Sequence, residues 1–91
     1  MYLEIVSPEA TLFSGEVESV VVPGVNGAFE ILKDHAPIIS LLKGGEVKIS
    51  GNITLDTNFE DRFTKSTNGY ALPINSGTIE MKDNKVIVLA D

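Results

Sequence analysis

Apolar and polar residues alternate with a period of two along most of this chain. The clearest case is the stretch 77–90, "GTIEMKDNKVIVLA", in which Ile79 and Met81 alternate with polar residues. Asp83 and Asn84 then supply a turn that reverses the chain into a second strand. Gly, Pro or Asn interrupts the alternation about every eight to twelve residues, which is typical of a sandwich or a barrel. The sequence therefore predicts an all-β fold built from short strands.

Further strands are predicted by the same rule. "GEVKIS" places Val47 and Ile49 on one face, and "GEVESVVVPG" places Val17, Ser19 and Val21 on one face. "YLEIVSP" predicts a first strand that its proline stops, and "TLFSG" predicts a short second strand.

Two segments are less regular. The run 38–42, "IISLL", has two adjacent isoleucines after a proline, which favours a buried strand over a short helix. The segment 51–69 is rich in Thr, Asn and charge, and its residual alternation predicts an extended hairpin with a mobile tip near 65–68.

The stretch "PGVNGAFEI" reads as a strand, a loop and a second strand. Gly24 and Gly27 are expected to provide the positive φ values of the loop. Phe29 and Ile31 lie on one face of the second strand, and we favour the core for both. The pattern does not match the glycine-rich loops that hold phosphates.

Length and charge limit the possible functions. A chain of 91 residues forms one domain, and the absence of cysteine excludes disulfides and thiolate metal sites. Thirteen acidic residues against seven basic ones give a net charge of −6, which disfavours nucleic acid and anionic lipid surfaces as partners. No apolar run approaches the roughly 20 residues of a membrane span, so direct membrane insertion is not expected.

The only histidine, His35, invites a catalytic interpretation because Asp34 precedes it. Neighbouring side chains on an extended strand point to opposite faces, so these two cannot easily bond to each other. There is no second histidine for a zinc site and no recognisable nucleophile motif or phosphate loop. Glu16 and Glu18 share a strand face and are expected to be solvated. We therefore expect no catalytic residue, no metal and no cofactor.

Several motifs in order resemble a known family. "LEIVSPE", "LFSGEVESVVVPG", "GAFEIL", "HAPIISLLKGGEVKI", "SGTIEM" and "NKVIVLAD" together resemble the epsilon subunit of the F-type rotary ATP synthase. The resemblance extends from Leu3 to Asp91, apart from the segment 52–68. It implies one β-sandwich domain over residues 1–91, with about ten short strands in two sheets. Many family members continue past "VLAD" into a helical hairpin, and by this resemblance residues 1–91 are expected to contain the sandwich without the hairpin.

The resemblance also implies a function and partners. The family's subunit is a non-catalytic rotor part of the central stalk, within a complex of alpha, beta, gamma and epsilon chains. It links gamma to the membrane ring of c subunits and couples proton or sodium flow to ATP synthesis, bound peripherally at the cytoplasmic side of the bacterial inner membrane. The implied contacts with gamma and the c ring lie at one end of the sandwich. The candidate contact residues are Asn26, Gly27, Ala28, Phe29, Glu30, Asp34, His35, Ala36 and Pro37.

The sequence departs from the family pattern in this region. Glu30 stands where the family usually shows glycine, and Lys33 and Asp34 stand in place of Pro-Gly. The runner-up hypothesis is a stand-alone β-sandwich that binds a small ligand or glycan, although the chain has no Trp and only two Tyr for a binding surface. A small hydrolase is the third hypothesis.

Overall fold

The computed structural model describes residues 1–91 and contains ten strands and one short 3-10 helix, which confirms the all-β prediction. The elements are β1 (Tyr2–Val6), β2 (Thr11–Glu16), β3 (Ser19–Gly24), β4 (Gly27–Leu32), β5 (Ile38–Leu42), β6 (Gly45–Ser50), η1 (Glu60–Arg62), β7 (Thr64–Ser66), β8 (Gly69–Ile74), β9 (Gly77–Lys82) and β10 (Lys85–Ala90). The structure has no helix with the length and apolar character that crossing a membrane requires.

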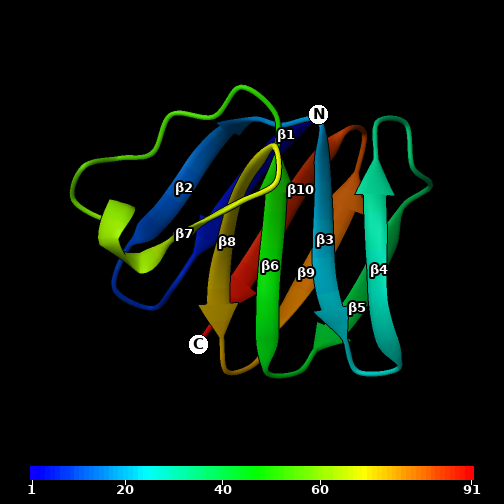
Figure 1. Cartoon of the computed structure of the whole chain (residues 1–91). Helices are drawn as coiled ribbons and strands as arrows, with labels where there is room; N and C mark the ends of the chain where they lie inside the picture. The colour runs from blue at the N-terminus through cyan, green and yellow to red at the C-terminus, as the bar shows by residue number, and fades with distance from the viewer.

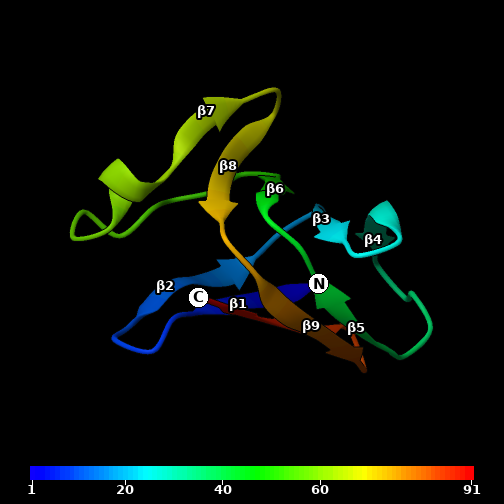
Figure 2. The same cartoon turned by 90° about the horizontal axis from the view of Figure 1, so that it is seen from below.

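The strands form one curled sheet that folds over into two layers (Figures 1 and 2). The first layer has the order β2-β1-β10-β9-β5, and the second has the order β3-β6-β8-β7 with β4 on the other side of β3. The layers are joined where β5 meets β3, through the single pair Gly24 and Leu42. All neighbouring strands are antiparallel except β1 and β10, which run parallel. This arrangement confirms the predicted sandwich.

The inward-facing residues of both layers form one hydrophobic core. Val47, Ile49, Ile79 and Met81 are buried, as their alternation predicts. The predicted face of the third strand is wrong, because Val20 and Val22 point into the core while Val21 does not. The chain leaves β2 after Glu16 and turns before β3 begins, so the alternation does not continue unbroken from buried Val17 into the strand.

The segment 51–63 leaves the second layer after β6 and returns to it at β7, and we call it the strap. Strand structure is confined to β7, which pairs with β8 through a tight turn, so the predicted long hairpin is wrong for most of its length. Ile53, Leu55 and Phe59 of the strap pack against the core, and Phe63 is buried in it. Figure 2 shows the strap between the edge strands β2 and β7, where the two layers are not joined. Its apolar side chains close this open side of the sandwich.

The two glycines of the β3–β4 hairpin have different roles. Gly27 has a φ of 125°, as predicted, but Gly24 lies within β3 and has no positive φ. A Cβ on Gly24 would lie 2.7 Å from the carbonyl oxygen of Gly27 and 2.8 Å from the ring of Phe29. Glycine is therefore needed at position 24 for close approach, and the space it leaves is taken by a half-buried Phe29 packed on the core.

Candidate functional site

The candidate contact residues fall into two groups that lie at opposite ends of β4. Residues 26–27 form the β3–β4 turn, and residues 34–37 lie in the connection from β4 to β5. Figure 1 shows the turn at the bottom of the view and the connection at the top. β4 spans about 17 Å between the turn and the connection, and the candidate residues Ala28, Phe29 and Glu30 lie along the strand itself. The expectation that all of them share one end of the sandwich is therefore wrong.

Strand β5 connects the two groups. Pro37 directly precedes β5, so the upper group leads into its first residue. At the other end, the backbone N–H of Val25 donates to the carbonyl oxygen of Leu41 at 3.2 Å. The candidate residues thus flank β5 at both of its ends.

The outward side chains of β5 are exposed. Ile39 is 78% exposed and Leu41 is 63% exposed, whereas Leu42 is buried. The prediction of a strand at 38–42 is confirmed, but the prediction that it is buried holds for only part of it. One face of β5 packs on the core and the other carries large aliphatic residues that no part of this chain covers.

These residues continue across the outer surface of the first layer. The strand register places Leu41 beside Thr78 of β9, Thr78 beside Leu89 of β10, and Leu89 beside Val6 of β1. A second row runs from Ile39 through Glu80 to Ile87 in the same way. We call this surface the apolar face, and it consists of Val6, Val25, Ile39, Leu41, Ile87 and Leu89.

The apolar face gathers most of the exposed apolar bulk of the domain. Six large hydrophobic residues are exposed in the chain, and three of them, Ile39, Leu41 and Leu89, lie on the strands of this face. Val25 adjoins these strands, and Tyr2 lies at the border of the face on β1. Part of the surface is hollowed into a groove of about 710 Å³ that Pro8, Val25, Leu41 and Leu89 help to line. A cluster of exposed aliphatic residues of this kind is typical of a site where another protein docks, although Thr78 and Glu80 interrupt its two rows.

The outer surface of the second layer is different in character. There the register brings Val21 of β3 beside Glu30 on one side and Lys48 on the other. Glu46 of the neighbouring strand is also exposed. Charged residues are therefore prominent on this layer, where Leu32 of β4 is the one large hydrophobic residue that is exposed.

His35 is exposed, and its hydrogen bonds go to backbone carbonyl groups. Its Nδ1–H donates to the carbonyl oxygen of Ala36 at 2.7 Å, and its backbone N–H donates to the carbonyl oxygen of Leu32 at 3.1 Å. Asp34 does not bond to it, but instead forms hydrogen bonds with Asn84 of the β9–β10 turn. No group of three or more His, Asp or Glu residues lies close enough together to hold a metal ion.

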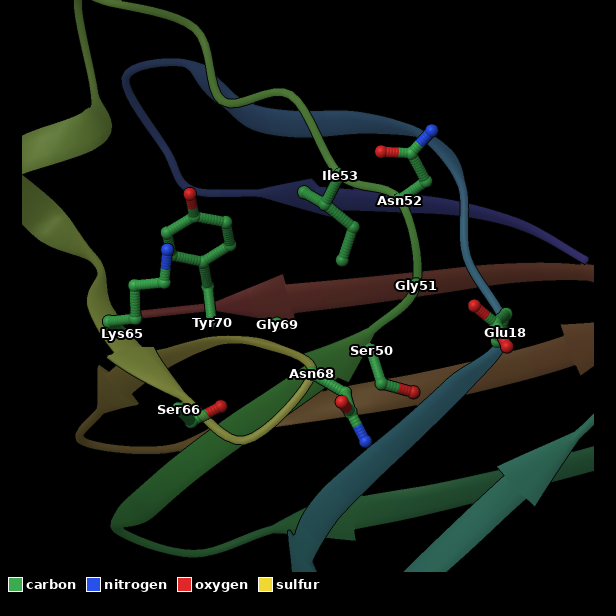
Figure 3. Close-up of a pocket in the computed structure, with 10 residues that line it drawn as sticks. All are labelled: Glu18, Ser50, Gly51, Asn52, Ile53, Lys65, Ser66, Asn68, Gly69 and Tyr70. Atoms are coloured by element: carbon green, nitrogen blue, oxygen red, sulfur yellow. The ribbon is translucent and has the colours of Figure 1, made fainter.

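A second hollow, of about 660 Å³, lies at the end of β6 beside the β7–β8 hairpin (Figure 3). Its lining is mostly polar, and Lys65 and Glu18 are its charged side chains. Figure 3 shows them on opposite sides of the hollow, and Nζ of Lys65 lies 5.8 Å from the ring centroid of Tyr70. These charges do not converge on one point, as the binding of a small charged ligand would require.

The apolar face was missed in the sequence, although the sequence contains a signal for it. "KVIVLA" and "IISLL" have apolar residues at consecutive positions, whereas "GEVKIS" and "GTIEMK" alternate strictly. A strand that is apolar on both faces is normally covered on both faces. In a two-layer fold the other layer covers only one face of each strand. The apolar outer faces of β5 and β10 therefore indicate a surface that another chain covers.

Comparisons with known proteins give a consistent result. Residues 1–91 match the family described as "ATP synthase, Delta/Epsilon chain, beta-sandwich domain". The chain is 40% identical over 89 residues to the ATP synthase epsilon chain of Chlorobaculum tepidum, covering 98% of this chain and 86% of that one. It is 41% identical over 91 residues to the ATP synthase epsilon chain of Campylobacter curvus, of which it spans 60%.

A solved structure shares the fold. A chain in the central stalk and c-ring structure of the Tetrahymena thermophila mitochondrial ATP synthase superposes with a TM-score of 0.75, covering 98% of this chain and 61% of that one. The identity of that pair is 10%, so the likeness concerns the fold alone.

Proposed function

The chain belongs to the delta/epsilon family of ATP synthase subunits, and from this we propose that it is a non-catalytic rotor subunit of the central stalk. In this role it links the gamma subunit to the membrane c ring and couples proton or sodium flow to ATP synthesis. It works at the cytoplasmic side of the bacterial inner membrane, as a peripheral part of a complex with alpha, beta and gamma chains.

The observation that carries the proposal is the apolar face. Lasting joints between subunits resemble a hydrophobic core cut in two, and the centre of such a joint is poor in charge. The apolar face supplies large exposed aliphatic side chains, Ile39, Leu41 and Leu89, and Glu80 is the charged residue that lies between its strands β5 and β10. Docking there covers side chains that the sandwich leaves in water, which favours a permanent joint with gamma over a transient contact.

The candidate contact residues complete the joint at its rim. The turn at Asn26 adjoins the end of β5 through Val25, and the connection 34–37 leads into its start, so a partner seated on the apolar face meets both. Asn26, Asp34 and His35 offer polar groups there, as the rim of an interface usually does, whereas Glu30 lies on the second layer. In this proposal His35 is a hydrogen-bonding residue of the contact with gamma and the c ring, and not a proton carrier.

Co-purification tests the proposal. The affinity-tagged chain, produced in its native host and solubilised from membranes in mild detergent, should bring down alpha, beta, gamma and c subunits in fixed ratio. A matched variant with Leu41→Asp and Leu89→Asp should fold but come away alone, because both side chains already contact water. Recovery of the unsubstituted chain without the other subunits would contradict the proposal.

A further inference from the structure

The connection that carries His35 is fastened to the β9–β10 turn by two reciprocal hydrogen bonds. The backbone N–H of Asp34 donates to Oδ1 of Asn84 at 2.6 Å, and Nδ2 of Asn84 donates to Oδ1 of Asp34 at 2.7 Å. The first bond requires an oxygen facing the N–H group, so it also fixes which side of the Asn84 amide faces the carboxylate. The two residues are 50 positions apart, the largest separation of any side-chain hydrogen bond in the chain.

Asn84 also holds a third element. Its backbone carbonyl accepts a hydrogen bond from the N–H of Tyr2, at the start of β1, at 2.9 Å. Its φ of 60°, beside the φ of 53° at Asp83, belongs to the tight turn that joins β9 to β10. One residue therefore ties together β1, the β9–β10 turn and the connection before β5.

Asp34 lies in a backbone conformation that most residues avoid. Its φ is 65°, and the bond from His35 to Leu32 makes it the third residue of a four-residue turn. That position usually takes glycine or asparagine when φ is positive. An aspartate tolerates it when its side chain forms local hydrogen bonds, and here the partner is Asn84.

We propose that Asn84 is a positioning residue for the His35 connection, which it holds in its docking shape before the partner arrives. The inference rests on the proposed function, because it takes residues 34–37 to be part of the contact surface. A segment ordered in the free protein loses little conformational entropy when it binds. The apolar face and the connection are thereby presented to a partner as one preformed surface.

Exchanging the two side chains tests this directly. Asn84→Asp places two carboxylates together and removes the Nδ2 donor, so it should break the hydrogen bond between the two side chains and force them apart. Asp34→Asn keeps an acceptor for the Asn84 amide and should have a small effect. The double variant, Asp34→Asn with Asn84→Asp, restores a donor and a carboxylate in exchanged places. All three variants keep side-chain size, and Asn and Asp both tolerate a positive φ.

Two measurements are made on each variant. The first is hydrogen exchange at the His35 amide of the free chain, with the amide of buried Val88 as the control for global stability. The second is affinity for ATP synthase depleted of this subunit. Asn84→Asp should speed exchange at His35 and weaken binding, each about tenfold, and the double variant should recover most of both.

Each other outcome is also decisive. Unchanged exchange in Asn84→Asp, or no recovery in the double variant, would overturn the proposal. Faster hydrogen exchange at His35 in Asn84→Asp with unchanged affinity for ATP synthase would also overturn the proposal for Asn84. In that case the proposed function would still stand, because the unsubstituted chain binds in the same assay. If the unsubstituted chain fails to bind, the proposed function is wrong, and this proposal falls with it.

Discussion

Replacing Ile39 by threonine separates docking from folding. Threonine keeps the β-branched shape that suits a strand, and it removes about two methylene equivalents of apolar surface. Full burial of that surface stabilises by about 1.6 kcal/mol, at about 0.8 kcal/mol per methylene.

The exposed fraction of Ile39 determines how much of this free energy is gained on docking and how much on folding. Because 78% of the residue is exposed in the free chain, about 1.2 kcal/mol belongs to docking and about 0.4 kcal/mol to folding. The first value corresponds to an affinity about eightfold weaker, and the second is close to the error of a denaturant titration. Ile39→Thr should therefore weaken binding with little change in the free energy of unfolding.

Titration calorimetry against ATP synthase depleted of this subunit measures the first quantity, and urea unfolding of the free chain measures the second. Val21→Thr is the matched control, because Val21 is also β-branched and faces outward, on the charged side of the second layer. It should leave the affinity unchanged. An affinity for Ile39→Thr within twofold of the unsubstituted chain would refute the assignment of the apolar face, as would an equal loss in the control.

Three further predictions concern the stability of the fold. Phe63→Ala removes the most buried ring of the strap and should lower the free energy of unfolding by about 3 kcal/mol, measured by urea titration. Gly69→Ala would place a Cβ 1.8 Å from the carbonyl oxygen of Ile49, so it should cost at least about 3 kcal/mol, and a melting temperature like that of the unsubstituted chain would contradict the strand spacing. Lys85→Ala removes a surface ion pair with Glu4, 3.3 Å long, and should change stability by less than about 1 kcal/mol in a salt-dependent way, which unfolding at low and high salt checks.

The inward alternation of the strands is the part of the fold that the sequence predicts well. Val47, Ile49, Ile79 and Met81 are buried because a strand exchanges faces at every residue, and each of their strands has one polar side. The prediction failed at Val21, where a break after the preceding strand changes which residues face inward. The period-two alternation of the sequence does not reveal where a strand ends and the inward face changes, because this depends on the turn between strands.

Features that depend on distant parts of the chain were less predictable. The strap at 51–63 has an irregular pattern because it closes the gap between β2 and β7 and does not pair as a strand. The bridge between Asp34 and Asn84 joins residues from two turns, and no local pattern indicates it. The placement of the candidate contact residues at one end followed from the family resemblance, although the strand predicted at "GAFEI" carries the chain from the turn to the connection.

The position of β10 has a consequence for how the protein is made. β10 lies between β1 and β9, so β1 has no neighbour in the first layer other than β2 until residues 85–90 leave the ribosome. A two-stranded hairpin is at best marginally stable by itself, so the earliest part of the chain remains unfolded for most of translation. Strands β3, β4, β6 and β8 can pair as they emerge, because their neighbours are made close together. We therefore expect the second layer to form first, and the first layer to close more slowly, because the pairing of β1 with β10 joins residues more than 80 positions apart.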